Sequence, residues 1–282
     1  MEVIGTIAEL RRATGDARAR GRSLGFVPTM GAFHDGHRSL IQRSRADTDS
    51  TIVSVYVNPL QFSDDDDLAR YPRTRERDLG DAERLGVALV FAPGDHEMYP
   101  DGDPVVTVDP GSLGERLEGA FRPGHFRGVS TVVAKLFNAV GPSRAYFGEK
   151  DAQQVAVIRR MVRDLSIPVE LATCPTVREP DGIAMSSRNA LLAPEDRDAA
   201  GCLFLALTEA AERARAGERD AAVLVAVMAR EIGGTPRARL DYAAVVDDET
   251  FEDVRTIAGP VRALVAARFG NVRLIDNLVL PT

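Results

Sequence analysis

Cysteine is scarce in this sequence, and the two residues present form no motif. Cys174 and Cys202 are the only cysteines among 282 residues, with no CxxC pair and no Cys/His cluster. These absences exclude a disulfide-stapled scaffold and a zinc knuckle, and they fit the reducing cytosol. We therefore expect a cytoplasmic protein.

Long apolar runs and an excess of positive charge are also missing. The first residues, MEVIGTIAEL, lack a basic segment followed by an apolar one, and no stretch stays apolar for the roughly 20 residues that a membrane span requires. The net charge is −7 and the pI is about 5.3, so the average surface repels a polyanion. We expect no membrane and no nucleic acid as partners, and an anionic substrate has to meet a local positive site.

The first two thirds of the chain alternate strand-like and helix-like segments. Apolar residues recur at i, i+3, i+4 and i+7 from Val129 to Val140 and again from Asp151 to Val162, which predicts helices. Strands that alternate with helices form parallel βαβ units. The sequence therefore predicts an α/β fold with a Rossmann-like doubly wound parallel sheet and helices on both of its faces. The predicted strands are Ser23–Pro28, Thr51–Val57, Val87–Phe91 and Arg144–Phe147.

The pattern changes after about Asn189. An Ala-rich amphipathic segment over Pro194–Gly217 predicts one helix, and Asp220–Ile232 predicts a second. Strand-like stretches follow at Leu240–Val246 and Val272–Val279. About 90 residues are enough for a separate small domain. We predict a Rossmann-like domain over residues 1–185 and a smaller C-terminal α+β domain over residues 186–282.

The segment Pro28–His37, PTMGAFHDGH, directly follows the first predicted strand. Two of the four histidines, His34 and His37, lie here beside Gly31 and Gly36, which let the backbone turn tightly and approach a ligand. A helix that begins near His37 directs free N–H groups toward the carboxyl edge of the sheet, a place that favours phosphate. Imidazoles there can donate hydrogen bonds as charge develops on phosphate. The alternative is two ordinary polar residues in a tight loop, which explains an HxGH pattern at this position less well.

Two further segments carry groups suited to phosphate. Tyr146–Asp151, YFGEKD, is a second strand-to-helix turn, in which Lys150 can act as a point charge on phosphate and Asp151 as a helix N-cap. Met185–Arg188, MSSR, offers hydroxyl groups and a guanidinium that can close over a triphosphate. Each pattern alone also occurs in ordinary loops, so neither is decisive without the other motifs.

Taken together, the HxGH turn and the MSSR loop resemble the nucleotidyltransferase superfamily that includes the class I aminoacyl-tRNA synthetases. The Lys that usually opens the second motif is missing and Arg188 closes it, which argues against a synthetase proper. The finer resemblance, over nearly the whole chain, is to the pantothenate synthetase (pantoate–β-alanine ligase) family. Asp35 stands where that family often has Glu, and Arg77 lies in a stretch that is usually more acidic. The matching blocks, in the family's order, are FVPTMGAFHDGH (26–37), VSVYVNPLQF (53–62), YPRTRERDL (71–79), LEGAFRPGHFRGVSTVVAKLFN (117–138), AYFGEKDAQQ (145–154) and REPDGIAMSSRN (178–189).

The resemblance implies an ATP-dependent ligase that condenses (R)-pantoate with β-alanine, a reaction of pantothenate and coenzyme A biosynthesis. The pantoate carboxylate attacks the α-phosphate of ATP and pyrophosphate leaves. The amine of β-alanine then attacks the pantoyl adenylate and gives pantothenate and AMP. Residues 1–185 are implied to bind ATP and pantoate, and residues 186–282 to form a lid.

The resemblance also implies roles for single residues. The catalytic ones are His37, His34, Lys150 and Arg188, with His37 as an acid or as a hydrogen-bond donor to the charge on phosphorus. Those that bind ATP are Met30, Gly31, Ala32, Phe33, His34, Asp35, Gly36, His37, Gly148, Glu149, Lys150, Asp151, Val177, Met185, Ser186, Ser187 and Arg188. Those that bind the other substrates are Gln61, Gln154, Thr29 and Asn58, since a primary amide offers both donors and acceptors.

Other residues receive weaker assignments. Val132, Val133 and Leu136 form either an apolar wall for the gem-dimethyl group of pantoate or plain helix core. His125 is expected to be structural and His96 to lie on the surface.

Mg²⁺ is expected to accompany ATP, because the charge of a triphosphate must be neutralised before an anion attacks it. The phosphates themselves can hold most of the ion, and Asp78 is the single candidate ligand from the protein. The resemblance further implies a homodimer whose small-molecule partners are ATP, pantoate and β-alanine.

Two other functions stay open. One is an enzyme that adenylates a phosphate ester, as in NAD or coenzyme A synthesis; such enzymes usually lack the VNPxQF and FRGV blocks and the C-terminal domain. It makes a dinucleotide and never AMP. The other is a non-catalytic nucleotide-binding module, which the intact HxGH, GEKD and MSSR segments disfavour.

Overall fold

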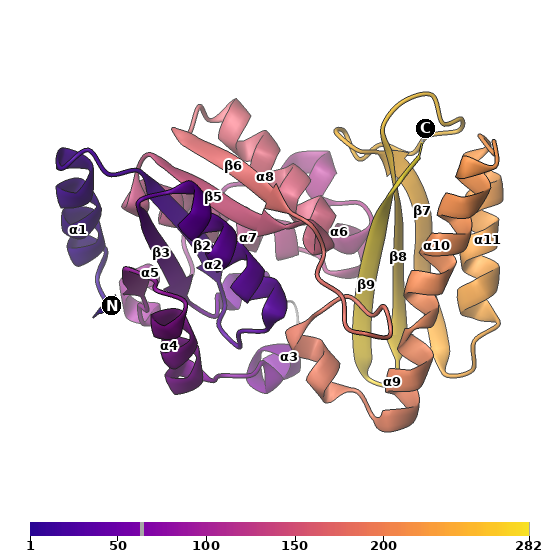
Figure 1. Cartoon of the computed structure of the whole chain (residues 1–282), viewed down its shortest axis with the longest axis horizontal. Coiled ribbons are helices and arrows are strands. Elements are labelled where there is room, and N and C mark those ends of the chain that lie inside the picture. The colour runs from indigo at the N-terminus through magenta and orange to yellow at the C-terminus, as the bar shows by residue number, and fades with distance from the viewer. Residues whose placement is uncertain (63–64, 282) are drawn as a thin grey trace. The chain divides into compact units, whose positions relative to one another are not determined.

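The computed structural model describes residues 1–62 and 65–281 (Figure 1). The chain separates into two compact units. The first contains Met1–Glu149 and Gln153–Pro175, and the second contains Lys150–Ala152 and Thr176–Thr282. The segment between Pro175 and the predicted domain boundary after Met185 belongs to the second unit, where it forms a hairpin.

The first unit is built on a six-stranded sheet in which all neighbouring strands are parallel. From β2 the chain proceeds through β3 to β4 on one side and later adds β5 on the other, so the strand order reverses beside β2. Open α/β sheets bind their ligands outside the carboxyl ends of the strands at such a reversal. In spatial order the strands are β1 (Glu2–Ile4), β4 (Leu89–Phe91), β3 (Ser50–Val55), β2 (Leu24–Thr29), β5 (Ser143–Gly148) and β6 (Val169–Cys174).

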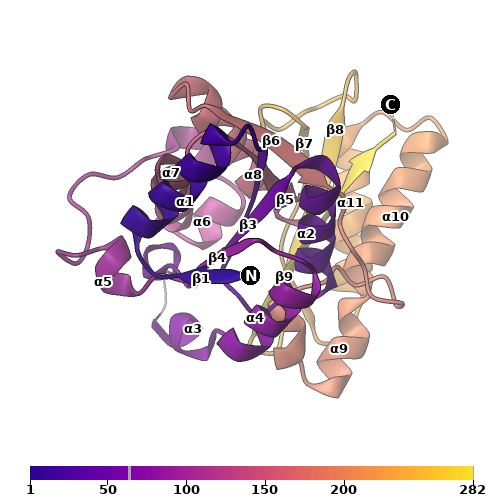
Figure 2. The same cartoon turned by 60° about the vertical axis from the view of Figure 1, so that its left-hand side comes forward.

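Successive strand residues enter two separate apolar clusters, one on each face of this sheet. Phe26 and Ile52 belong to one cluster, whereas their neighbours Val27 and Val53 belong to the other. Side chains alternate between the faces of a strand, so both faces are covered, as in a doubly wound fold. The first face packs against α1 (Ile7–Ala19) and α7 (His125–Val140), and the second against α2 (Asp35–Asp47) and α4 (Arg75–Arg84), as Figure 2 shows. The predicted Rossmann-like fold is confirmed.

The remaining elements complete the first unit and the passage to the second, and one of them, α8, adds Val155, Ile158 and Met161 to the cluster of the first face. They are η1 (Pro59–Gln61), α3 (Asp65–Arg70), α5 (Asp95–Met98), η2 (Gly111–Gly114), α6 (Glu118–Phe121), η3 (Glu149–Asp151) and α8 (Ala152–Asp164). Of these, η1, η3 and α8 carry residues with predicted roles in binding.

The second unit is an antiparallel sheet with two long helices on it, which confirms the predicted α+β domain. The strand order is β7 (Ala238–Asp247), β8 (Val261–Phe269) and β9 (Val272–Leu280), and α10 (Cys202–Arg215) and α11 (Ala221–Gly233) pack against it. The sequence had not indicated β8. The single helix predicted over Pro194–Gly217 is wrong, because α9 (Pro194–Ala200) and α10 are separated at Gly201, a residue of low helix propensity. The 3₁₀ helix η4 (Ser187–Leu191) precedes them.

No helix within residues 1–62 and 65–281 has both the length and the apolar character needed to cross a lipid bilayer.

Candidate active site

The turn after β2 adopts a compact backbone conformation. Thr29 ends the strand, and its hydroxyl donates to the Ser54 carbonyl at 2.7 Å and accepts from the Gly31 N–H at 3.1 Å. Gly31 and Ala32 follow with φ of 81° and 51°, both in the left-handed region. A Cβ atom at Gly31 would lie 3.0 Å from Oδ2 of Asp78. Glycine is therefore required here both for its backbone angle and for the close approach of a carboxylate.

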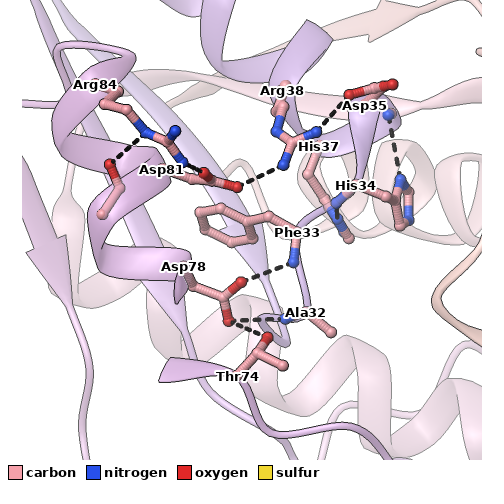
Figure 3. Close-up of polar contacts among 12 residues, drawn as sticks. Ala32, Phe33, His34, Asp35, His37, Arg38, Thr74, Asp78, Asp81 and Arg84 are labelled. Atoms are coloured by element: carbon pink, nitrogen blue, oxygen red, sulfur yellow. Dashed lines mark hydrogen bonds and ion pairs between the residues drawn. The ribbon is translucent and has the colours of Figure 1, made fainter. Parts of the chain in front are cut away.

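The Asp78 carboxylate, on α4, binds this turn through both of its oxygens (Figure 3). Oδ1 accepts from the Phe33 N–H at 2.8 Å, and Oδ2 accepts from the Ala32 N–H at 2.9 Å and the Thr74 hydroxyl at 3.1 Å. Asp78 is only 1% exposed. Three donors thus engage a buried carboxylate, which gives it a role in shaping the turn. Among the described residues no group of three or more His, Cys, Asp or Glu side chains could hold a metal, so its role as a Mg²⁺ ligand stays a prediction.

The two histidines of the turn lie against the beginning of α2. His34 is the N-cap residue, and its Nδ1 accepts from the Gly36 N–H at 3.1 Å. Nδ1 of His37 accepts from the His34 N–H at 3.5 Å, and the two ring centroids are 4.1 Å apart. A ring nitrogen that accepts carries no hydrogen, so in each neutral ring Nε2 bears the proton and is the donor. Two imidazole donors therefore lie at the positive end of a 13-residue helix, an arrangement suited to phosphate oxygens.

Ion pairs tie α2 to the helix that carries Asp78. Arg38 donates to Asp35 at 2.5 Å and to Asp81 at 2.7 Å, and Arg84 also pairs with Asp81 (Figure 3). The hydrogen bond from Arg38 lowers the pKa of Asp81 below its ordinary value, and the same bond raises the pKa of Arg38. This link between α2 and α4 was not indicated by the sequence.

A buried amide cluster lies at η1 and joins two predicted substrate residues to the turn. Asn58, 1% exposed, donates to Gln61 Oε1 at 3.1 Å and to the Gly128 carbonyl at 3.2 Å, and it accepts from the Tyr99 hydroxyl at 2.8 Å. The amide nitrogen of Gln61 lies 3.1 Å from the sulfur of Met30. The structure therefore brings together Asn58, Gln61 and Met30, three of the residues predicted to bind substrates.

His125 fixes the main chain of Gln61. Its Nε2 lies 3.1 Å from a guanidinium nitrogen of Arg122. Arginine can only donate, so this Nε2 accepts, and the Nδ1–H donates to the Gln61 carbonyl at 2.8 Å. This contact agrees with the structural role expected of His125, and the exposed His96 lies on the surface as predicted.

Helix α7 packs closely on η1 at Gly128. A Cβ atom there would lie 2.2 Å from the Leu60 carbonyl oxygen, so only glycine allows this approach. Val132, Val133 and Leu136 are buried in the core cluster of the first face. They are helix core, and their contact with pantoate stays a prediction.

The two glutamines near the start of α8 differ in their surroundings. Gln153 is buried; it accepts from the Glu118 N–H at 3.0 Å and donates to the carbonyls of Leu113 at 2.9 Å and Arg116 at 2.8 Å. These bonds hold the polypeptide around α6. Gln154 is partly exposed, and its role in binding pantoate stays a prediction.

β5 brings the second predicted phosphate segment to the same edge of the sheet as the HxGH turn. β5 is the direct neighbour of β2, with Phe26 opposite Ala145. Each strand runs three residues further, to Thr29 and Gly148. The residues that follow, Met30 in one case and Glu149 in the other, therefore leave adjacent strands at their carboxyl ends.

In the second unit, Lys150 and Ser186 line one small cavity together with Asp276. The Lys150 ammonium lies 3.3 Å from the Asp151 carboxylate. Ser186 caps η4, and its hydroxyl accepts from the Arg188 N–H at 3.2 Å. Two of the segments predicted to bind phosphate thus meet within this unit.

The residues before η4 form an anchored hairpin. The Met185 N–H donates to the Val177 carbonyl at 2.9 Å, and the Glu179 N–H donates to the Ile183 carbonyl at 2.9 Å. The Asn189 amide donates to the Glu179 carboxylate at 2.6 Å, which joins the hairpin to η4. The backbone of the MSSR segment is therefore defined by hydrogen bonds on both sides.

Neither cysteine has the surroundings of a nucleophile. Cys174 and Cys202 are both buried, and burial raises the pKa of the Cys174 thiol and raises that of Cys202 to about 11. Thiolate chemistry is therefore disfavoured at neutral pH.

Comparisons with known proteins agree with these features. A family model described as pantoate-beta-alanine ligase matches residues 2–279. The chain belongs to this family. The pantothenate synthetase of Chloroflexus aggregans is 53% identical over 282 residues, which cover 99% of this chain and 100% of the relative. That of Moorella thermoacetica is 52% identical over 280 residues, 99% of each chain.

Solved structures of the pantoate-beta-alanine ligase family have the same fold. The crystal structure of pantothenate synthetase from Thermus thermophilus matches with a TM-score of 0.92 and 47% identity, over 100% of both chains. A pantoate-beta-alanine ligase from Francisella tularensis, crystallised with beta-gamma ATP and beta-alanine, matches with a TM-score of 0.80 and 33% identity, over 99% of this chain and 97% of that one.

Proposed function

We propose that this chain condenses pantoate with β-alanine and converts one ATP to AMP and pyrophosphate. The observation that carries the proposal is the match to the pantoate-beta-alanine ligase family over residues 2–279, with relatives above half identity at full length. The paired imidazole donors of His34 and His37 at the start of α2 are the chemical feature that this reaction needs.

In the first step a carboxylate oxygen of pantoate attacks the α-phosphorus of ATP. The bond from that phosphorus to the bridging oxygen breaks, and pyrophosphate leaves with the electron pair. Negative charge grows on the oxygens around phosphorus, where His34 and His37 donate through Nε2. Such donors are worth about 10²–10³ in rate each when they are aimed at the developing charge.

Lys150, Ser186, Ser187 and Arg188 hold the β- and γ-phosphates in this proposal. Two observations support it: Lys150 and Ser186 line one cavity, and Lys150 follows the carboxyl end of β5, the neighbour of the strand that leads into the HxGH turn. A compact ammonium and a planar guanidinium both suit phosphate oxygens.

In the second step the amine of β-alanine attacks the acyl carbon of pantoyl adenylate. The bond from that carbon to the phosphate oxygen breaks, AMP leaves, and the nitrogen loses a proton as the amide forms. Gln61 and Gln154 bind the hydroxyls and carboxylate of pantoate, with Asn58 and Thr29 behind them. Support comes from the buried cluster in which Asn58 orients the amide of Gln61.

ATP enters as its Mg²⁺ complex, and the phosphates supply most of the ligands of the ion. The fixed hydrogen bonds of Asp78 and the lack of a metal-binding group of side chains among the described residues support this division. We also propose a cytoplasmic homodimer, supported by the scarcity of cysteine and by the family resemblance.

An assay of products tests the function. With ATP, Mg²⁺ and pantoate, pantothenate should appear only when β-alanine is added, in equal amounts with AMP and pyrophosphate. Formation of a dinucleotide from a phosphorylated substrate, with no AMP, would support an enzyme that adenylates phosphate esters. ATP binding without turnover in the unmutated chain, unchanged by His37→Ala, would support a binding module.

A further inference from the structure

Strand β9 carries two adjacent polar residues that are both buried. Asp276 and Asn277 are each 3% exposed. Asp276 receives two hydrogen bonds from the Arg178 guanidinium, at 2.6 Å to Oδ2 and 3.0 Å to Oδ1. The same guanidinium donates to the Gly182 carbonyl at 3.0 Å and lies 4.0 Å from the ring centre of Phe204. Asp276 therefore holds the guanidinium of Arg178, and this guanidinium joins the two ends of the turn in the hairpin that leads to Ser186.

Asn277 reaches the other phosphate-binding segment of the second unit. Its amide nitrogen donates to the main-chain carbonyl of Lys150 at 2.8 Å. Its amide oxygen accepts from Arg262 at 2.5 Å, and Arg262 in turn pairs with Asp248 at 2.5 Å. The orientation of the amide is thus defined, because an arginine can bond only to the oxygen and a carbonyl only to the nitrogen.

The contact of Asp276 with the hairpin and the contact of Asn277 with Lys150 lie beside the same cavity. Lys150, Ser186 and Asp276 line the same small cavity, so the group that grips the hairpin lies beside the side chains proposed to bind phosphate. Neither Asp276 nor Asn277 belongs to a motif with a predicted role. Their contacts are with Arg178, 98 residues away, and with Lys150, 127 residues away.

We propose that Asp276 and Asn277 are positioning residues for ATP, which align the MSSR segment and Lys150 from one rigid strand. The proposal rests on the proposed function, and it assigns to the C-terminal strand a part in adenylation. Neither residue has to touch substrate, since Asp276 acts through the side chain of Arg178 and Asn277 through the main-chain carbonyl of Lys150. Misplacement of such groups by about 1 Å can lower a rate about 10²-fold.

Because Asp276 is buried, its ion pair with Arg178 is better suited to orienting the hairpin than to stabilising the fold. A buried ion pair is a weak source of stability, because desolvation of both charges offsets their attraction. Burial raises the pKa of the Asp276 carboxyl, and the hydrogen bonds from Arg178 oppose that rise. The pair instead fixes the orientation of both side chains, because a bidentate guanidinium–carboxylate contact allows only one relative geometry.

The test compares Asp276→Asn and Asn277→Asp with a control from the same sheet. Asn277→Asp keeps an acceptor for Arg262 and removes the donor to Lys150. The control is Asp241→Asn: Asp241, on β7, is 7% exposed in its side chain and pairs with Arg273 of β9 at 2.6 Å. Asp241→Asn removes a buried carboxylate that pairs with Arg273 and Arg268, and among the described residues Asp241 has no hydrogen bond or ion pair to the hairpin or to Lys150.

Three quantities are measured for each folded variant: the rate of pantoyl adenylate formation, the KM for ATP and the Kd for pantoate. We expect Asp276→Asn and Asn277→Asp to lower kcat/KM for ATP in adenylation about 10- to 100-fold. The Kd for pantoate should be unchanged, and Asp241→Asn should stay within about threefold of the unmutated chain in all three. Equal losses in Asp276→Asn and Asp241→Asn, or parallel losses in ATP and pantoate binding, would overturn the proposal.

A double variant separates alignment from stability. Arg178→Met with Asp276→Leu removes both charges, and such apolar replacements are often neutral or stabilising. We expect its midpoint of urea unfolding to return toward that of the unmutated chain while adenylation stays slow. Recovery of adenylation together with stability would refute a positioning role. Absence of adenylate in the unmutated chain is a different result, which counts against the proposed function itself.

Discussion

Asp78 shows how a single buried carboxylate can shape the turn that we propose to bind phosphate. Its oxygens collect the N–H groups of Ala32 and Phe33, and Ala32 has the left-handed φ of 51°. A non-glycine residue in that region is strained and needs compensation from its neighbours. These bonds provide it, and the turn then delivers His34 and His37 to the start of α2.

A substitution at Asp78 distinguishes this role from metal binding. In Asp78→Asn one oxygen becomes an NH₂ group that faces a donor, so the turn loses at least one hydrogen bond. We expect the KM for ATP to rise about 10-fold or more, as for displaced binding groups. The Mg²⁺ concentration for half-maximal rate, measured at saturating ATP, should not change. A higher Mg²⁺ requirement with an unchanged KM for ATP would instead make Asp78 a ligand of the ion.

Asp81 contributes to the stability of the fold, and this contribution depends on pH. Its pKa is lowered in the folded chain by Arg38, so folding favours the ionised form. That stabilisation is present above the unfolded pKa of about 4 and is lost as the pH falls through the lower folded value. We expect Asp81→Asn to reduce the free energy of unfolding by about 1–3 kcal/mol at pH 7. Urea unfolding of both chains from pH 7 to pH 3 should show the difference shrinking; a constant difference would contradict this account.

At the level of elements, the contact between α7 and η1 sets the position of Gln61. A Cβ atom at Gly128 would lie 2.2 Å from the Leu60 carbonyl oxygen and 2.7 Å from the Gln61 nitrogen. Gly128→Ala must therefore move η1 or strain α7. We expect the KM for pantoate to rise about 10-fold, which corresponds to about 1.4 kcal/mol, within the usual range for overpacking.

The control for this variant is Gly15→Ala in α1, where a Cβ atom meets nothing within 4 Å. Alanine is favoured over glycine within a helix, so stability should be equal or higher and the KM for pantoate unchanged. If Gly128→Ala binds pantoate as well as Gly15→Ala does, then η1 does not position a substrate group.

Elements with strong local patterns were predictable, and those that depend on tertiary context were not. The β-branched run predicted as a strand over Thr51–Val57 forms β3 over Ser50–Val55, because β-branched residues suit a buried strand. Val261–Phe269, VRALVAARF, is rich in alanine, which favours helix, yet it is the central strand of the second sheet. Its burial between two strands and beneath two helices outweighs its local preference.

The same distinction holds for the site. The turn with His34 and His37 was predictable, because its residues are contiguous in the sequence. Asp78 lies 46 residues from Ala32, and Asn277 lies 127 residues from Lys150. Contacts at such separations leave no local signal in one sequence. Supporting contacts were therefore missed, among them the hydrogen bonds of Asp78 to the turn, whose side chain was predicted only as a Mg²⁺ ligand.

At the scale of the whole molecule, a protein with a net negative charge has to bind ATP, which is itself highly negative. The net charge of −7 gives no general attraction for ATP, so binding depends on a few directed groups. The reversal of strand order beside β2 places the HxGH turn at the carboxyl edge of the sheet, and Asn277 of β9 bonds to Lys150 in the second unit; we propose that these segments supply such groups. The central claim is that these groups serve the transfer of AMP to pantoate.

Pyrophosphate release in the absence of β-alanine tests that claim most directly. The chain is mixed with ATP, Mg²⁺ and pantoate, and pyrophosphate and bound pantoyl adenylate are quantified over a single turnover. We predict one pyrophosphate per adenylate, a rate about 10²–10³-fold lower in His37→Ala, and an unchanged rate in the control His96→Ala. Pyrophosphate that appears only after the amine is added, or a His37→Ala variant that forms adenylate at the full rate, would contradict the account.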